Sequence, residues 1–355
     1  MGIFGKERDL TQVQKEVELR VDASFFRARA EELEMRLDAF LTAHLTWRSR
    51  TSIQALIKDG YVLIDPSTPD HPRGTGTAIP ERKSSRKLRH GSRVIVVIPE
   101  ELRAPVVENP SSELTVLYED DAVVVVDKPA NMAVHPSGRH MVDTLIQRVH
   151  ARYGAGFELE RGGAPRLCHR LDRETSGIVI VGRHPSGMAD VQQQFERREV
   201  EKEYLTIVAG VIDREGGTID YPIGPARASE VGIKMAIAVD GQPCRTDWKV
   251  VKRYRGCTLV SCEPYTGRQH QIRVHMAALG YPVIGDKLYG DDDSLFERGL
   301  DGTLTAADMR ALGMDRHALH NHRTAFVSPA TKQRVEVRSP LPADMQKYLD
   351  EHESA

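Results

Sequence analysis

The spacing of apolar residues in the first hundred positions predicts a small unit of strands and helices. Residues 16–21, EVELRV, alternate apolar and polar side chains as a half-buried strand does. Residues 35–46 carry leucine and phenylalanine at helical spacing, and a second short helix is predicted to follow over 48–60. Two further strands are predicted in this unit, YVLID at 61–65 and SRVIVVIPEE at 92–101.

From residue 114 onward, strands follow one another in pairs and helices occur at irregular intervals. The predicted strands lie at 114–129 (two strands about an acidic turn), 176–183, 202–212 and 246–267, the last a hairpin that turns at Arg255-Gly256. The predicted helices lie at 141–154, 185–200 and 267–280. This order favours an α+β domain around a mixed, mainly antiparallel sheet.

Composition shifts divide the chain into three parts. Residues 1–14 are predicted to be a flexible charged tail, 15–103 a small α/β domain, and 104–355 a larger domain. Prolines 105 and 110 mark the linker between the two domains. Two segments look like insertions, a Pro- and Gly-rich loop near 66–85 and a stretch near 291–315.

The composition is typical of a globular protein, with 40% hydrophobic and 28% charged residues and a formal net charge of −2. No apolar stretch approaches the roughly 20 residues that span a bilayer. The charged N-terminus also lacks the apolar core of a signal peptide. We therefore expect a cytoplasmic monomer with no membrane partner. The near-zero net charge hides a strongly basic run at 81–93, which could contact an anionic partner.

Cysteines and histidines do not predict a metal site. The four cysteines have no metal-ligand spacing and are expected to be buried thiols. RHALHNH, residues 316–322, briefly suggests a metal site, but no cysteine or acidic cluster lies near it in the sequence. No metal and no cofactor are expected.

The segment HRLDRETSG, residues 169–177, places an aspartate between arginines just before a predicted buried strand. It is not a kinase catalytic loop, because Leu171 interrupts HRD and no Gly-rich loop or DFG accompanies it. It is not an aspartic protease motif, since Glu174 stands directly before the threonine. In isolation, HRLD would be interpreted as a structural ion pair. It is not isolated, because three further motifs occur in order around it: VVVVDKPANMAVHP (123–136), KEYLTIVAG (202–210) and PYTGRQHQIRVHMAALGYPVIGDKLYG (264–290).

This ordered set closely resembles the RluA family of pseudouridine synthases, including RluD-like members with an N-terminal S-four-like RNA-binding domain. The resemblance covers about residues 16–340. It implies the pseudouridine synthase fold and an isomerase that detaches uracil from its ribose within RNA, rotates it and rejoins it through carbon 5. One departure is Asn131, which stands where the family usually has glycine and which tolerates the positive φ of such a turn.

Two other functions are alternatives to the isomerase. The first is a non-catalytic RNA-binding or ribosome-assembly factor of the same fold. It is disfavoured because Asp172, Tyr204 and Arg273 are all present. The second is a small-molecule hydrolase that uses Asp172. It is disfavoured because neither a paired carboxylate nor an oxyanion-hole motif accompanies this aspartate in the sequence.

The resemblance also implies roles for single residues in the larger domain. Asp172 matches the essential carboxylate; attack at carbon 1′ of the ribose and abstraction of a ribose proton both stay open. Arg273 matches the arginine that pairs with this aspartate. Tyr204 matches the tyrosine that stacks on the extruded base, and its help in removing the carbon-5 proton stays open. Arg170 is expected at the mouth of the site, whereas Arg268 and His270 are candidates for binding phosphates beside the target.

The N-terminal domain contributes a second set of candidates. Its helix-turn-helix-strand pattern resembles the S-four-like domain, and cations on one face would neutralise RNA phosphates. The predicted RNA-binding residues are Arg36, Arg48, Arg50 and Lys58. The expected partner is RNA, in particular large-subunit ribosomal RNA or ribosome-assembly intermediates.

Overall fold

A computed structural model provides the fold of the chain. It describes residues 15–23, 29–30, 33–45, 50–68, 76–100, 111, 113–136, 142–153, 165–229, 231–290, 292 and 294–353. The chain divides into two compact units, Met1–Pro110 and Ser111–Ala355. The predicted tail, the linker prolines and the boundary at 103/104 lie outside the described residues, as does part of the insertion near 66–85.

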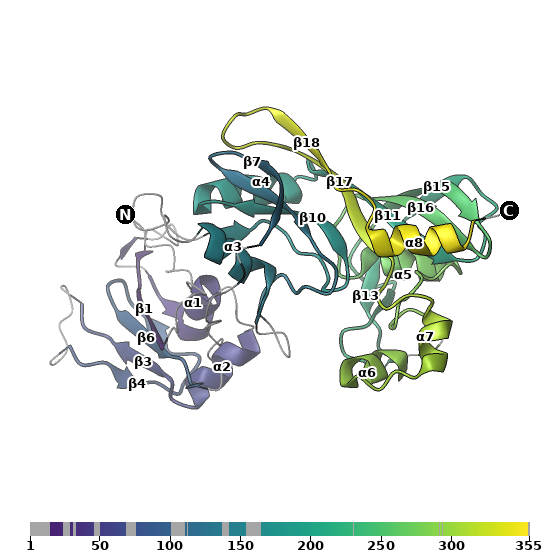
Figure 1. Ribbon diagram of the computed structural model, residues 1–355. Helices are drawn as coiled ribbons and strands as arrows, with labels where there is room; N and C mark the ends of the chain where they lie inside the picture. Colours follow the sequence, from purple (N-terminus) through teal and green to yellow (C-terminus); the bar gives the residue numbers. More distant parts are fainter. Residues whose placement is uncertain are drawn as a thin grey trace. The chain divides into compact units, whose positions relative to one another are not determined.

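The smaller unit contains two helices and six strands within its described part (Figure 1). The helices are α1 (Leu37–His44) and α2 (Arg50–Lys58). The strands are β1 (Glu16–Arg20), β2 (Met35–Arg36), β3 (Val62–Asp65), β4 (Ile79–Pro80), β5 (Lys87–Leu88) and β6 (Arg93–Val97). Four of them form a sheet in the order β1-β6-β3-β4, and β2 pairs with β5.

The apolar stripes of the two helices form one core with the sheet. Leu37, Phe40 and Ile53 are fully buried, and they pack with Val94 and Val96 of β6. The helical spacing that predicted α1 and α2 is therefore the spacing of the residues that reach the core.

The larger unit is built on a ten-stranded sheet. Its strands run in the order β12-β15-β16-β11-β17-β10-β8-β7, with β18 paired to β17 and β9 to β10. Only the pair β10–β17 is parallel among the described pairings of this sheet. The predicted mixed, mainly antiparallel sheet is thus confirmed. The strands are β7 (Thr115–Glu119), β8 (Val123–Lys128), β9 (Arg166–Leu167), β10 (Ser176–Gly182), β11 (Glu201–Ala209), β12 (Gly216–Ile219), β15 (Thr246–Tyr254), β16 (Cys257–Pro264), β17 (Leu319–Val327) and β18 (Arg334–Arg338), and a separate hairpin is formed by β13 (Ile223–Pro225) and β14 (Met235–Ile237).

Helices cover this sheet and extend from one end of it (Figure 1). They are α3 (Leu145–Tyr153), α4 (Pro185–Glu196), α5 (Gln271–Ala278), α6 (Ser294–Asp301), α7 (Ala306–Leu312) and α8 (Ala343–Glu351). Met345 and Leu349 of α8 are buried in the same core as Val250 of β15 and Val260 of β16. None of the described helices is both long and apolar enough to cross a membrane.

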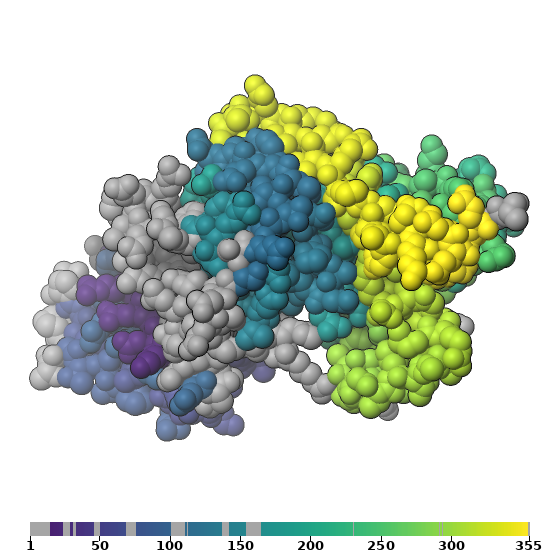
Figure 2. Space-filling view, viewed as in Figure 1, coloured from purple at the N-terminus to yellow at the C-terminus, as the bar shows by residue number. Residues whose placement is uncertain are grey.

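The segment predicted as an insertion near 291–315 folds into α6 and α7. Figure 2 shows this yellow-green segment as a lobe below the C-terminal part of the chain. Helix α7 begins with a capping box between Thr305 and Asp308 and ends at Gly313, which has a φ of 74°. The segment is therefore ordered by ordinary helix signals, which our prediction of an insertion did not include.

The elements after residue 315 were missing from the sequence predictions. Strand β17 lies between β11 and β10, near the middle of the sheet. Its sequence, LHNHRTAFV, carries polar residues at positions that a buried strand usually gives to apolar ones. His320 and Asn321 are nevertheless buried, because hydrogen bonds to neighbouring strands satisfy their side chains.

Candidate active site

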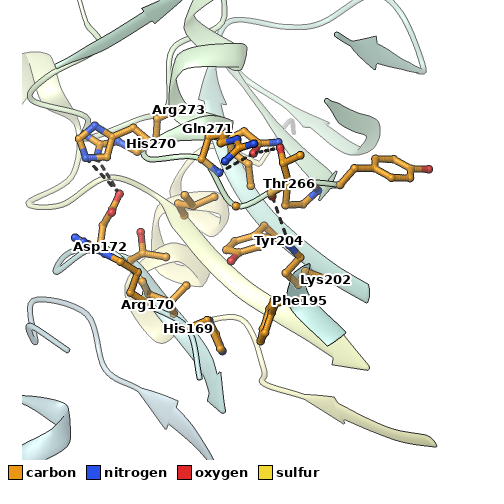
Figure 3. A pocket seen from close by; sticks show the side chains of 18 of the residues that line it. His169, Arg170, Asp172, Phe195, Lys202, Tyr204, Thr266, His270, Gln271 and Arg273 are labelled. Atoms are coloured by element: carbon orange, nitrogen blue, oxygen red, sulfur yellow. Dashed lines mark hydrogen bonds and ion pairs between the residues drawn. The ribbon is translucent and has the colours of Figure 1, made fainter. Parts of the chain in front are cut away.

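All six residues that the sequence placed at the active site line one cavity of about 470 Å3 in the larger unit (Figure 3). The cavity is formed by the loop before β10, the start of β11 and the segment that leads into α5. The residues that it brings together are Arg170, Asp172, Tyr204, Arg268, His270 and Arg273. They are up to 103 positions apart in the sequence, between Arg170 and Arg273, so the fold is what assembles them.

The loop that carries Asp172 is fixed by buried polar contacts on both sides of the aspartate. The Thr175 hydroxyl lies 2.7 Å from Nε2 of His317, and the Ser176 hydroxyl lies 3.0 Å from Nδ1 of His320. Lys128 donates from its buried ammonium to the carbonyl of Arg173 at 3.1 Å and to two carbonyls of its own turn. These bonds to Lys128 of β8, to His320 of β17 and to His317 just before β17 fix the loop that carries the carboxylate.

Gly177 explains why the motif ends in glycine. Its φ is 109°, and a Cβ there would lie 2.3 Å from the carbonyl oxygen of Asn321. Gly177 pairs with Asn321 in the single parallel pairing of β10 with β17. The glycine therefore permits a close approach of two strands. The turn predicted at Asn131 does occur, with a φ of 62°.

Arg273 has two carboxylate partners, and the sequence predicted only the weaker one. Its Nη1 donates to Oδ2 of Asp172 at 3.2 Å. Its Nε and Nη2 donate to the two oxygens of Asp286 at 2.6 and 2.7 Å, a bidentate pair. The Asp286 side chain is completely buried, while that of Asp172 is 25% exposed. Asp286, in the GDKLYG segment, is a site residue that sequence reasoning missed.

The charges of this pair are mutually stabilised. Burial alone would raise the pKa of Asp286, but Arg273 and the backbone N–H groups of Leu288 and Tyr289 hold this pKa below its ordinary value. Burial alone would lower the pKa of Arg273, and the two carboxylates raise it instead. Both groups are therefore charged at neutral pH.

His270 is a buried ring that faces Asp172. Its Nε2 lies 3.8 Å from Oδ2 of Asp172, and its Nδ1 lies 2.7 Å from the hydroxyl of Tyr289. The side chain is only 7% exposed, and burial lowers the pKa of His270 to about 4. A neutral, enclosed imidazole is poorly suited to bind a phosphate, so the geometry disfavours the role that the sequence suggested. Arg170 and Arg268, in contrast, are exposed at the edge of the same cavity.

Tyr204 forms part of the cavity wall, and its ring is partly enclosed (Figure 3). Burial and the negative charge of Asp172 raise the pKa of its hydroxyl. Because a phenolate is harder to form here than in water, the environment favours stacking by the ring over proton abstraction by the oxygen.

Lys202, which sequence reasoning did not single out, lines the cavity next to Tyr204 (Figure 3). Its ammonium donates to the carbonyl of Thr266 at a long 3.4 Å and lies 5.7 Å from the centre of the Phe195 ring. Burial lowers the pKa of Lys202 to about 8. The only local signal was a lysine two positions before the tyrosine on the same strand.

Histidines and cysteines form no metal centre in the part of the chain that the structure describes. No group of three or more His, Cys, Asp or Glu side chains there has a metal-binding arrangement. All four cysteines are buried free thiols. The histidines of RHALHNH bond to Thr175 and Ser176, which follow Asp172, and to the backbone of Ser339.

In the smaller unit, two of the four predicted RNA-binding residues, Arg36 and Arg50, bind a buried aspartate. Asp38 accepts hydrogen bonds from the guanidinium groups of Arg36 and Arg50 at 2.9 to 3.0 Å. Its side chain is completely buried, while those of Arg36 and Arg50 are 51% and 61% exposed. Lys58 is exposed at the end of α2, and Arg48 lies outside the described residues.

Comparison with known proteins agrees with this geometry. The family model described as RNA pseudouridylate synthase matches residues 122–278, which include Asp172, Tyr204 and Arg273. A Bacillus subtilis protein named uncharacterized RNA pseudouridine synthase YlyB is 32% identical over 91% of this chain and 96% of its own length. The chain belongs to the RNA pseudouridine synthases. Its activity is therefore the isomerisation of uridine to pseudouridine in RNA, and the resemblance to this family is confirmed.

Two further relatives of this pseudouridine synthase extend the comparison. A Xanthomonas campestris protein named ribosomal large subunit pseudouridine synthase D is 35% identical over 88% of both chains. The solved structure of human RNA pseudouridylate synthase domain containing 1 is 27% identical, covers 66% of this chain and 86% of its own, and has a TM-score of 0.51. The predicted pseudouridine synthase fold is thus confirmed.

Proposed function

We propose that this pseudouridine synthase modifies uridine in large-subunit ribosomal RNA and that Asp172 is its essential carboxylate. The RNA class is supported by relatives from Xanthomonas campestris and Neisseria meningitidis, both named ribosomal large subunit pseudouridine synthase D, at 35% and 32% identity. The observation that carries the residue assignment is the position of Asp172. Its carboxylate lines the cavity of about 470 Å3, 3.2 Å from Nη1 of a buried arginine.

The resemblance to the family implies the reaction, and this placement lets Asp172 take part in it. The target uridine leaves the RNA stack and enters the cavity, where its base stacks on Tyr204. Asp172 then either attacks carbon 1′ or removes the proton from carbon 2′. In both routes the bond between carbon 1′ and N1 breaks, and its electron pair stays with the base. The base turns, forms a bond from carbon 5 to carbon 1′, and loses the carbon-5 proton, while N1 gains a proton. Asp172 becomes a free carboxylate again, in the first route because its ester bond to carbon 1′ breaks and in the second because it returns the proton to carbon 2′.

Arg273 and Asp286 keep this carboxylate oriented through the reaction. Because Asp286 occupies two of the guanidinium nitrogens, Arg273 offers only one hydrogen bond to Asp172. Asp172 is thereby oriented without being fully neutralised, which suits a group that must act as nucleophile or base.

The smaller unit is proposed to hold the ribosomal RNA. Its exposed Arg36 and Arg50 are fixed in position by Asp38, and Lys58 ends the same helix. Such cations neutralise phosphates and release counterions, which gives affinity with little sequence reading.

The decisive experiment measures tritium release from carbon-5-labelled RNA by wild type and Asp172→Asn. Wild type should convert a large-subunit rRNA transcript and leave tRNA unconverted, and Asp172→Asn should convert neither. Carbodiimide-based mapping of pseudouridines in cells with and without the chain should then show a loss confined to large-subunit rRNA. Conversion of tRNA in place of rRNA would refute the substrate class, and residual turnover of Asp172→Asn above a few per cent would refute the residue assignment.

A further inference from the structure

The proposed reaction moves a negative charge across the cavity. When the base leaves with the electron pair of N1, it carries a negative charge that is spread over N1 and the two carbonyl oxygens. At the same step Asp172 loses its own charge, either in an ester bond to carbon 1′ or by taking up a proton. Both routes therefore need a cation near the base, at some distance from Asp172.

The cavity offers few cations for that position among its described residues. Arg273 is committed to Asp286 and Asp172. Arg170, Arg198 and Arg268 are exposed, where water screens their charge. The histidines at 169 and 270 are neutral, since burial lowers their pKa values to about 3 and about 4. Lys202 is the remaining cation.

Lys202 is half-buried and incompletely satisfied. No carboxylate of the described residues lies within ion-pair distance of its ammonium, which contacts the carbonyl of Thr266 at 3.4 Å and the ring of Phe195. An ammonium has three N–H donors, and burying it with one long hydrogen bond destabilises the fold. A lysine that is kept in such a place is expected to bind an anion that the free protein lacks.

Its position relative to Tyr204 suits the leaving base. Lys202 and Tyr204 stand two residues apart on β11, and both line the cavity across a shift in the pairing of β11 with β17 between Glu203 and Tyr204. In the view of Figure 3, Tyr204 lies between Asp172 and Lys202. A base stacked on the tyrosine thus has its ribose near Asp172 and an edge near the ammonium.

Building on the proposed function, we propose that Lys202 is a further catalytic residue. Its ammonium binds a carbonyl oxygen of the detached uracil and stabilises the anionic charge of the base while it turns. Lys202 transfers no proton in this step; the negative charge that leaves Asp172 at one end of the cavity is received near Lys202 at the other.

Substitution with methionine and with arginine tests this role. Lys202→Met keeps the length of the side chain and removes the charge, whereas Lys202→Arg keeps the charge. Lys249→Met, an exposed lysine of β15 outside the cavity, is the matched control. The measurements are the single-turnover rate of pseudouridine formation at saturating rRNA fragment, the Kd for that fragment, and the melting temperature.

We expect Lys202→Met to lower the single-turnover rate by about 100-fold or more, the usual effect of removing one donor to a developing anion. Its Kd should stay within about threefold of wild type, and its melting temperature should stay equal or rise, because an unpaired buried charge is gone. Lys202→Arg should recover part of the rate. Since Lys202 is neutral above a pH of about 8, wild type should slow in the alkaline range where Lys202→Arg does not. Lys249→Met should behave as wild type.

Two results would overturn the inference. A weaker Kd for Lys202→Met with an unchanged saturated rate would show that the ammonium binds a backbone phosphate instead. An unimpaired rate and Kd would show that it binds no part of the substrate. The proposed function is tested separately by wild type in the same assay. If wild type forms no pseudouridine, the proposed function and this inference are both refuted. If wild type converts the fragment, the result for Lys202→Met alone decides whether Lys202 is catalytic.

Discussion

Arg273 and Asp286 form a buried ion pair whose structural and catalytic roles can be separated by a double-mutant cycle. The variants are Arg273→Met, Asp286→Asn and the two combined. Both side chains are nearly inaccessible, at 7% and 0% exposure, and their two hydrogen bonds are 2.6 and 2.7 Å long. Removing one member of such a pair leaves the other charge buried without a full partner.

The expected loss in the free energy of unfolding depends on which buried charge each variant leaves without its partner. In Arg273→Met, Asp286 keeps two backbone N–H donors but loses its cation, which should lower the free energy of unfolding by about 3 to 5 kcal/mol. In Asp286→Asn, Arg273 keeps one bond to Asp172, and the cost should fall at or below the lower end of that range. Replacing both charges with neutral side chains should restore most of the loss, because neither group is then stranded.

The assay is thermal unfolding of the full chain, followed by far-UV circular dichroism, together with tritium release per folded molecule. For a domain of this size, about 3 to 5 kcal/mol corresponds to a shift in melting temperature of about 6 to 20 °C. The double variant should melt within a few degrees of wild type and still form no pseudouridine, since Arg273 is needed to orient Asp172.

A second aspartate–arginine pair supplies the control. Asp344 binds Arg316 through two bonds of 2.6 and 2.9 Å, but Asp344 is 47% exposed and Arg316 contacts backbone carbonyls as well. Asp344→Asn should therefore cost less stability and leave turnover per folded molecule unchanged. Strictly additive losses in the Arg273–Asp286 cycle would refute the argument that the two charges neutralise each other. Recovery of turnover in the double variant would refute the role of Arg273 in orienting Asp172.

Three other predictions test the remaining assignments. Asp172→Asn should reduce the rate of pseudouridine formation by several orders of magnitude while its RNA affinity in a filter-binding assay stays near that of wild type, because phosphate contacts supply most of the binding. Tyr204→Phe should retain most of its activity, since the raised pKa of the hydroxyl favours stacking; a loss above about 100-fold in the single-turnover rate would indicate proton transfer instead. The double variant Arg36→Gln with Arg50→Gln should reduce the slope of log affinity against log salt by up to about two, about one for each phosphate contact that is lost, and turnover of a short accessible RNA should not change. An unchanged slope would exclude these residues from the RNA interface.

Much of the fold follows from local patterns. Strand β10 is a run of seven buried residues, and its apolar sequence was sufficient to predict it. The hairpin of β15 and β16 turns at Arg255 and Gly256, where Gly256 has a φ of 78°. Strand β17 could not be predicted in this way, because its buried His320 and Asn321 are stabilised by partners in β10 that lie more than a hundred residues away in the sequence.

The candidate site shows the same division. Motif resemblance located Asp172, Tyr204 and Arg273, and the structure brings all three to one cavity. It gave no role to Asp286 or Lys202, because an isolated aspartate or lysine does not reveal whether its partner is present or missing. The structure supplies that information: Asp286 is fully paired with Arg273, and Lys202 has a single long hydrogen bond.

These two residues together explain how the cavity can tolerate the displacement of a charge. Before the reaction, Arg273 faces two carboxylates, Asp172 and Asp286. Once Asp172 has lost its charge to an ester or a proton, Asp286 still neutralises Arg273, so no buried cation is stranded at that end. At the other end, Lys202 is unpaired in the free protein and gains its partner only when the uracil anion forms. If Lys202 already had a carboxylate partner in the free protein, the uracil anion would have to displace that partner, and no new ion pair would be gained. The incomplete pairing of Lys202 in the free enzyme therefore becomes a stabilisation of the intermediate, and the stability gained by Lys202→Met should be accompanied by a loss of rate.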